Sequence, residues 1–410
     1  MSKINELIQT LCPDVVEYKL FGDVASICRG ASPRPIKQFV TEDAEGVNWI
    51  KIGDTKVGSK YITETAEKIT EAGAKKSRYV HIGDFIMSNS MSFGRPYICQ
   101  IEGCIHDGWL AISEFHDSFN SDFLYYLLCS TMVQKMMEKK ASNGGAVSNL
   151  NADIVRALEL PVPPLPVQEE IVRILDEYTD LEAELEAKLS EEVELKQKQY
   201  MFYMDKLLTF GDTVEWKRLS DCCKNIGDGL HGTPVYDLIS NYYFINGNNL
   251  KNKKIVIDEK TKRVNEESFI KYMLKLDSST LLMSINGTIG NLAMYHGENV
   301  ILGKSVAYMS VLDSVLRRDF LYYLLQTTYT KQSLFQNVTG GTIKNLGLAV
   351  IRNFQIPVPS ITEQERIVKI LDKYDTYTRG MISTLNTELE SRKKQYAYYR
   401  DQLLTFKRKE

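Results

Sequence analysis

The sequence PVPPLPVQEEIVRILDEY at 161–178 returns as PVPSITEQERIVKILDKY at 357–374, 196 positions later. Between 168–178 and 364–374, eight of eleven positions are identical. The two copies also end alike, with KQKQYMFYMDKLLTF at 196–210 and KKQYAYYRDQLLTF at 393–406. An internal repeat of this length indicates that the chain contains two related structural units.

Each copy has the pattern of a long helix. The PVP run before it cannot continue a helix backwards, so it marks a start, and Gly211 follows the first copy where a helix would stop. In the second copy, Thr362 and Glu365 fit a T-x-x-E capping box. We therefore expect two helices of about 43 residues, or roughly 65 Å, in the segments 161–211 and 357–410.

The apolar residues of both copies recur at steps of three and four, which is typical of a coiled-coil seam. If the two helices pair antiparallel, the second returns to the globular segment that precedes the first. Chain order then predicts two globular units at opposite ends of a rod, related by an approximate two-fold axis. The predicted seam consists of Ile171, Ile174, Tyr178, Leu181, Leu185, Ile367, Ile370, Tyr374, Tyr377 and Met381.

The segments before the helices, 15–160 and 212–356, are diverged copies of each other. The motif DFLYYLL occurs in both, and MSNSMSFG at 87–94 aligns with MSINGTIG at 283–290. Short β-type runs broken by Gly, Asn and Ser predict an α+β fold for each segment. We expect DFLYYLLCSTMVQKMMEKK and its counterpart to form one amphipathic helix on each sheet. Residues 1–14 form a further short amphipathic helix in this interpretation.

Composition sets limits on the class of protein. The chain has 410 residues, of which 43% are hydrophobic and 25% are charged, as in ordinary globular proteins. It has no apolar run of eighteen residues and no signal-peptide core, so a cytoplasmic protein without a membrane span is expected. The net charge is −3, but 167–194 holds eleven acidic and two basic residues, net −9, which leaves +6 elsewhere. The balance therefore does not decide for or against nucleic acid.

The sequence offers no catalytic or metal constellation. Gly303-Lys304-Ser305 follows Gly297 with five intervening residues instead of the four of a phosphate-binding loop. The five histidines and seven cysteines lack the spacing of metal ligands, and reduced thiols are expected. What remains is a set of Arg, Lys, Asn and Ser residues in loops that differ between the two segments. Such residues can contact phosphates and base edges, although a solvated loop has the same composition.

Two variable segments alternate with two near-identical helices, each introduced by P-V-P-x-x-x-x-Q-x-x-I-V-x-I-L-D. This arrangement resembles the specificity subunit of type I restriction-modification systems along the whole chain. The resemblance implies that 15–160 and 212–356 are target recognition domains, each reading one half of a split, asymmetric site in double-stranded DNA. The helices would set the gap and dock two modification subunits.

The resemblance also implies that the chain has no active site and no cofactor of its own. S-adenosylmethionine, ATP and Mg would be bound by partner subunits that methylate adenine, move along DNA and cut it. Aligned repeats then give the candidate DNA-contacting residues: Arg29, Ser32, Arg34, Lys76, Arg78, Ser88, Asn89, Ser92 and Arg95 in the first domain, and His231, Thr233, Asn248, Asn249, Lys251, Asn286, Thr288 and Lys344 in the second.

Two other function classes fit parts of the sequence. A coiled-coil scaffold that binds only proteins would explain the helices, but not two different sets of polar loops. An enzyme with an unrecognised site is disfavoured by the lack of paired catalytic groups. Salt-dependent DNA binding separates the first hypothesis from both.

Overall fold

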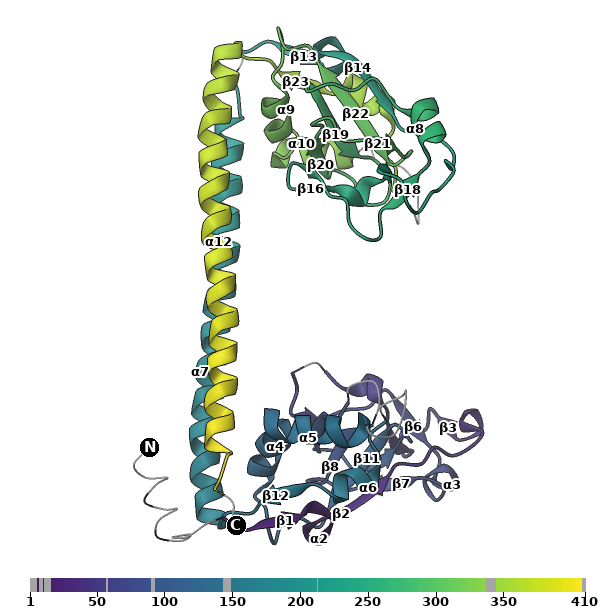
Figure 1. Ribbon diagram of the computed structural model, residues 1–410, viewed down its shortest axis with the longest axis vertical. Coiled ribbons are helices and arrows are strands. Elements are labelled where there is room, and N and C mark those ends of the chain that lie inside the picture. Colours follow the sequence, from purple (N-terminus) through teal and green to yellow (C-terminus); the bar gives the residue numbers. More distant parts are fainter. Residues whose placement is uncertain are drawn as a thin grey trace. The chain divides into compact units, whose positions relative to one another are not determined.

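The computed structural model describes residues 16–56, 58–89, 93–142, 149–211, 213–336 and 344–407, together with Glu6 and Thr10. The chain divides into two compact units, labelled by their elements in Figure 1. Unit 1 comprises Met1–Lys188 and Thr387–Glu410, and unit 2 comprises Leu189–Asn386. The helix expected at 1–14 lies almost entirely outside the described residues.

Unit 1 is built on two five-stranded sheets, and a short ladder joins the two ends of its globular part. The ladder pairs β1 (Tyr18–Leu20) with β12 (Glu159–Pro161). One sheet has the order β2 (Ser26–Arg29), β11 (Trp109–Ser113), β8 (Phe85–Ser88), β9 (Pro96–Cys99) and β5 (Tyr61–Ile62). The other has the order β3 (Val40–Thr41), β6 (Glu67–Ile69), β4 (Val47–Ile50), β10 (Gly103–Ile105) and β7 (Arg78–Val80).

Short helices complete unit 1, and the predicted amphipathic helix is in fact two helices. The chain breaks at Ser130, whose hydroxyl accepts a hydrogen bond from the amide of Val133 and so caps the second helix. The core lies where the first of these helices meets the β2 sheet and the start of the long helix. The helices are α2 (Phe21–Val24), η1 (Ile36–Gln38), η2 (Ile52–Asp54), α3 (Glu71–Ala74), α4 (Ser121–Cys129), α5 (Thr131–Ser142) and α6 (Ala152–Arg156).

Unit 2 repeats this plan with fewer strands. Its main sheet has the order β14 (Cys223–Asp228), β22 (Val306–Val311), β19 (Thr280–Ser284) and β20 (Leu292–Met294). The second has the order β18 (Lys262–Val264), β15 (Tyr242–Ile245) and β21 (Val300–Leu302). Two short ladders pair β13 (Trp216–Arg218) with β23 (Gln355–Pro357) and β16 (Leu250–Lys251) with β17 (Lys254–Ile255).

The helices of unit 2 show the same break as those of unit 1. Here Thr327 ends the first helix and caps the second, because its hydroxyl accepts from the amide of Thr330. The apolar side of both helices packs into the core of the main sheet. The helices are η3 (Leu219–Cys222), η4 (Gly247–Asn249), α8 (Glu266–Tyr272), α9 (Arg318–Leu324), α10 (Thr328–Phe335) and α11 (Leu348–Asn353).

The two long helices are α7 (Leu165–Leu207) and α12 (Ile361–Leu403), and each has the 43 residues that the repeat predicted. The capping box expected at Thr362 and Glu365 is wrong, because the residue that caps the helix is Ser360. Ser360 precedes the helix, and its hydroxyl accepts from the amide of Glu363 at 3.3 Å. Thr362 is therefore already inside the helix, and the chain begins its helix two residues earlier than the box implied.

Within each unit, segments of α7 and α12 pair antiparallel. In unit 1 the hydroxyls of Thr179 and Tyr396 are 2.8 Å apart, and the Lys393 ammonium lies 3.0 Å from the Glu186 carboxylate. In unit 2 the ring of Tyr374 stacks on Tyr200 at 6.0 Å. Higher numbers in α7 thus meet lower numbers in α12, which confirms the antiparallel arrangement of the fold class.

The predicted seam is wrong at several positions. Leu181 is 60% exposed and Tyr377 is 64% exposed, whereas the neighbouring Thr378 is 8% exposed. Near Tyr377 the residue that packs inward is therefore the next one along the helix, Thr378, whose side chain is polar. Of the predicted seam, Ile171 and Ile367 are buried, Ile174, Leu185, Tyr374 and Met381 are half-buried, and Tyr178, Leu181, Ile370 and Tyr377 are exposed.

A tyrosine in each unit ties the globular part to a long helix. In unit 1 the Tyr126 hydroxyl donates to Asp176 at 2.6 Å. In unit 2 the Tyr323 hydroxyl donates to Asp372 at 2.6 Å, and Lys253 donates to both of these side chains at 2.7 Å. Burial raises the pKa of Tyr323, and the bond to Asp372 raises it further, so the phenol stays a donor. The sequence suggests that Lys253 is a basic residue of an exposed loop, but its ammonium group is bonded to Tyr323 and to Asp372 of α12.

Replacing Tyr323 with phenylalanine is expected to lower the free energy of unfolding of unit 2 by about 1–2 kcal/mol, because Asp372 and Lys253 lose a charge-assisted partner. Urea unfolding followed by the fluorescence of Trp216 measures this change. Tyr377→Phe, on an exposed ring of α12, the helix that carries Asp372, is the control and should leave the midpoint unchanged. Equal stability of the two variants would show that the hydroxyl contributes nothing.

Candidate nucleic-acid interface

In each unit one loop follows the first strand of the main sheet, which is β2 in unit 1 and β14 in unit 2. These two loops are equivalent. In unit 1 the Gly30 amide donates to the Trp109 carbonyl at 2.8 Å, and in unit 2 the Gly229 amide donates to Val306 at 3.1 Å. Both glycines lie against the backbone of the loop that precedes the partner strand, where a Cβ would overlap a carbonyl oxygen. The chain can make this close approach only with glycine, so the loops at 30–35 and 229–234 are held in the same place in both units.

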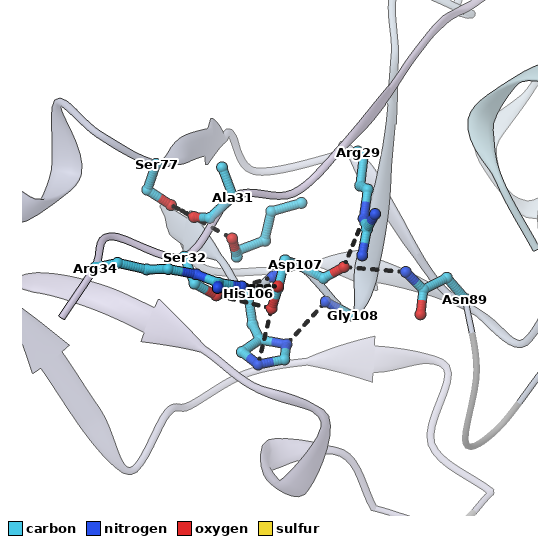
Figure 2. A network of polar contacts seen from close by, with 10 residues as sticks. Arg29, Ala31, Ser32, Arg34, Ser77, Asn89, His106, Asp107 and Gly108 are labelled. Atoms are coloured by element: carbon cyan, nitrogen blue, oxygen red, sulfur yellow. Dashed lines mark hydrogen bonds and ion pairs between the residues drawn. The ribbon is translucent and has the colours of Figure 1, made fainter. Parts of the chain in front are cut away.

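In unit 1 this loop surrounds the carboxylate of Asp107 (Figure 2). The Ser32 hydroxyl donates to one oxygen at 2.9 Å, and an Arg34 guanidinium nitrogen lies 3.5 Å from the other. The His106 Nε2 lies 3.1 Å from the carboxylate. Arg29 donates instead to the backbone carbonyl of Asp107 at 3.0 Å. Asp107 therefore organises donors that come from a different loop.

The charge state of Asp107 follows from these contacts. Burial opposes its ionisation, but the Ser32 hydroxyl and the positive charges of His106, Arg29 and Arg34 hold the pKa of Asp107 below its usual value. The carboxylate is therefore charged at neutral pH. The Arg34 side chain is 83% exposed, so its guanidinium can reach a ligand while one nitrogen remains near the carboxylate.

A hollow of about 780 Å³ opens beside this cluster in unit 1. Its floor includes the buried ring of Trp49, and its rim carries both signs of charge. A mixed, open and polar surface suits a charged partner with hydrogen-bonding edges better than a small apolar ligand. Its charged lining residues are Arg34, Lys37, Lys51, Glu67, His106 and Asp107.

In unit 2 the corresponding loops carry different groups. Asp228, the last residue of β14, pairs with His231 of the loop at 229–234, with 2.7 Å between the carboxylate and Nε2. A second loop, at 303–305 before β22, presents Lys304. This side chain is exposed and makes no ion pair within the described residues. Its backbone carbonyl accepts from the side-chain amide of Asn286 at 3.2 Å, and its amide donates to Leu230 at 3.1 Å. The two units share the backbone arrangement of these loops but differ in the side chains that the loops present.

The structure brings some of the unit 1 candidates together and separates others. Arg29, Ser32 and Arg34 meet at Asp107. Lys76 and Arg78 are exposed on the chain entering β7, and the Lys76 ammonium sits 4.7 Å from the Phe39 ring.

Ser88 and Asn89 are buried, 0% and 7% exposed, so the expectation that they face DNA is wrong for this conformation. Asn89 instead donates to the Asp107 carbonyl at 3.0 Å and supports the cluster from below. Arg95 is half-buried with its guanidinium 5.5 Å from the Tyr97 ring. Ser92 lies outside the described residues.

The unit 2 candidates divide in the same way. Asn249 is committed to its own loop: its side-chain oxygen accepts from the Asn246 amide, and its side-chain nitrogen donates to Val256 and Thr261. Asn286 is half-buried and bonded to the Lys304 carbonyl. The remaining candidates have exposed side chains: His231, Thr233, Asn248, Lys251, Thr288 and Lys344.

Sequence reasoning missed the residues at the centre of each cluster. Asp107 and His106 were not candidates, because a carboxylate is an unexpected neighbour for a nucleic acid. Asp228 was missed for the same reason. The signal was available in the repeat: IHDGW at 105–109 aligns with LGKSV at 302–306, which places Asp107 opposite Lys304.

Across the described ranges, no three His, Cys, Asp or Glu side chains are placed to hold one metal ion. None of the helices there combines the length and apolar content needed to cross a membrane.

Comparison with known proteins gives a consistent result. Residues 13–195 and 214–391 match the family model described as "Type I restriction modification DNA specificity domain". The specificity subunit of the Escherichia coli type I restriction enzyme EcoR124I/EcoR124II is 32% identical over 265 residues, which cover 61% of this chain and 62% of that protein. The alignment thus spans somewhat less than two thirds of that relative.

Two further likenesses extend over nearly the whole chain. The specificity subunit of the E. coli type I restriction enzyme EcoprrI is 24% identical over 399 residues, 93% of each protein. A solved structure described as the "structural basis underlying complex assembly and conformational transition of the type I R-M system" contains a chain with a TM-score of 0.72 and 17% identity. That match covers 96% of this chain and 98% of the other, and it shows the same fold.

Proposed function

Because this chain belongs to the type I restriction-modification DNA specificity family, we propose that each of its units reads one half of a bipartite, asymmetric DNA site. DNA sequence recognition is the general role of the family. The observation that carries the finer proposal is the pair of loops at 30–35 and 229–234. They occupy the same place on the same frame, yet one presents Arg29, Ser32 and Arg34 and the other presents His231 and Thr233.

The chemistry of these loops suits the major groove. An arginine can donate two hydrogen bonds to the O6 and N7 atoms of guanine, and serine or threonine can bond to several bases. Exposed lysines such as Lys76 and Lys251 supply sequence-independent contacts to phosphates, which position the protein on the duplex. The two units then read different half-sites, and the pairing of α7 with α12 sets the gap of unread bases.

The long helices are the proposed docking surface for two modification subunits. Leu181, Phe202, Tyr377 and Tyr398 are each at least 60% exposed, and large exposed apolar side chains are typical of protein interfaces. The proposed partners bind S-adenosylmethionine and, in the motor-nuclease subunits, ATP and Mg. This chain supplies recognition and no cofactor. The target adenine leaves the base stack and enters the partner's pocket.

The test is a methylation map of a randomised plasmid library from cells that express this chain with its modification subunit. We expect a split motif with a constant gap that disappears when this chain is omitted. A stable complex that methylates nothing and binds DNA no better at low salt than at high salt would instead support the protein-only scaffold, which the exposed helix side chains also fit.

Replacing Arg34 with alanine is expected to relax or abolish recognition of the unit 1 half-site, because its guanidinium is 83% exposed and can reach a base edge. Loss of a bidentate base contact costs about 1–3 kcal/mol of discrimination. The methylation map measures the effect base by base. Lys56→Ala, which removes an exposed cation paired with Glu64 elsewhere in unit 1, is the control. An Arg34→Ala complex with the parental motif and affinity would contradict the assignment.

A further inference from the structure

The loop positions 107 in unit 1 and 304 in unit 2 carry opposite charges at one equivalent point of the fold. Resting on the proposed function, we propose that these two residues determine how the half-sites differ. Asp107 acts as a positioning residue that aims the donors of unit 1, and Lys304 contacts a base edge directly. Asp107 was not among the candidates drawn from the sequence.

The equivalence of the two positions follows from backbone register. Arg29 pairs with Leu110 across β2 and β11, and Asp228 pairs with Ala307 across β14 and β22. In unit 1 the Asn89 amide donates to Gly108, and in unit 2 the Ile285 amide donates to Ser305.

Further bonds give the same register. The Ala31 amide donates to Ile105, and the Leu230 amide donates to Leu302. Position 29 therefore corresponds to 228, and position 107 corresponds to 304.

The charges at these corresponding positions are exchanged between the loops. In unit 1 the first loop carries cationic Arg29 and the second carries anionic Asp107. In unit 2 the first loop carries anionic Asp228 and the second carries cationic Lys304. At these two corresponding positions each unit thus holds one cation and one anion, with the order reversed.

The partners of each charge define its role. The Asp107 oxygens are already engaged by Ser32, His106 and Arg34, so the carboxylate fixes the direction of these donors and does not read DNA itself. In unit 2 the anion is paired with His231 within its own loop. Lys304 is left exposed without an ion pair among the described residues, on a loop whose backbone is bonded to Leu230 and Asn286.

This arrangement predicts different base preferences. Unit 1 presents the Arg34 guanidinium beside the Asp107 carboxylate, and its donors match the two acceptors of guanine in the major groove. Unit 2 presents a single ammonium from a fixed backbone, which can donate to one acceptor such as guanine O6 or N7, with the Asp228–His231 pair beside it. The bases at these two positions should therefore be set independently of each other.

The experiment maps methylation by the complete complex containing Asp107→Asn or Lys304→Gln. Each substitution keeps side-chain size close to the original and removes one charge. Matched controls are Glu64→Gln in unit 1 and Lys275→Gln in unit 2, which remove exposed charges outside the clusters. For Asp107→Asn we expect about tenfold weaker preference at one position of one half-site. For Lys304→Gln we expect the same at one position of the other half-site, with the gap unchanged.

Other outcomes overturn the inference. Lys304 is a phosphate contact if Lys304→Gln weakens binding to all sequences alike and lowers the slope of log affinity against log salt concentration by about one. If both variants methylate the parental motif with parental selectivity, neither position determines specificity, although the proposed function stands. If the parental complex itself gives no split motif, the proposed function fails first. Lys304 is exposed, so its variant remains a valid test even if Asp107→Asn disturbs folding.

Discussion

Replacing Gln168 with leucine is expected to lower the free energy of unfolding of unit 1 by about 3–5 kcal/mol, because three buried backbone groups lose their partner. The Gln168 side-chain oxygen accepts from the Asn120 amide at 2.8 Å. Its nitrogen donates to the carbonyls of Ser118 and Pro163 at 2.9 and 2.7 Å. The side chain is fully buried, so water cannot replace these bonds.

The second copy of the motif makes the same three contacts. Gln364 accepts from the Arg317 amide at 2.8 Å and donates to Val315 and Pro359, both at 2.9 Å. The glutamine repeated in both helix starts thus joins the loop before α4 or α9 to the turn that begins the long helix. Its role in the motif is to orient the globular part on that helix.

Unfolding by urea measures the effect of Gln168→Leu in a Trp216→Phe background, where fluorescence reports only the buried Trp49 and Trp109 of unit 1. Gln402→Leu, at an exposed position of α12 within unit 1, is the matched control and should change stability by less than about 0.5 kcal/mol. A Gln168→Leu protein as stable as this control would show that water or a rearranged loop satisfies the three groups.

Replacing Gly30 with alanine is expected to destabilise unit 1 by about 2–4 kcal/mol and to abolish reading of its half-site. The added Cβ would overlap the carbonyl oxygen of His106, so the two loops must separate. Separation breaks the bonds from the amides of Gly30 and Ala31 and moves the donors away from Asp107.

The control for this substitution is Gly53→Ala, because a Cβ at Gly53 meets no atom within 4 Å. Methylation mapping and urea unfolding should both be run on the two variants. The expected pattern is a motif that keeps the unit 2 half-site and loses the other. A Gly30→Ala complex with both half-sites intact would mean that the loop adapts without cost to recognition.

The positions of the long helices could be predicted from the sequence, because proline and the spacing of apolar residues each indicate one kind of structure. Proline before each helix and the repeated apolar steps placed both 43-residue helices. The pairing face was not readable, because it buries the polar residues Thr179 and Thr378 at least in part, while Tyr377 and Leu181 stay exposed. A pattern that weighs only apolar residues cannot detect a seam held partly by hydrogen bonds between threonine and tyrosine.

The candidate site was predicted in part. Loop arginines and serines were found because donors are typical of DNA-reading loops, and Arg29, Ser32 and Arg34 do meet. Ser88 and Asn89 were assigned wrongly, since strand ends look like loops in a sequence even when they are buried. Asp107 was missed because the sequence does not show that a carboxylate 73 positions away in the chain lies beside Arg34.

Unit 1 is closed by residues that are synthesised after all of unit 2. Leu404 is buried in its core, Asp401 accepts from the amide of Thr131, and the Phe406 carbonyl accepts from the Tyr18 hydroxyl. Unit 2, by contrast, is one uninterrupted stretch of chain, Leu189–Asn386. During synthesis the second recognition unit can therefore be completed before the first. A stop codon within the last turn of α12 would remove these contacts and so damage unit 1, most of which is encoded upstream of unit 2.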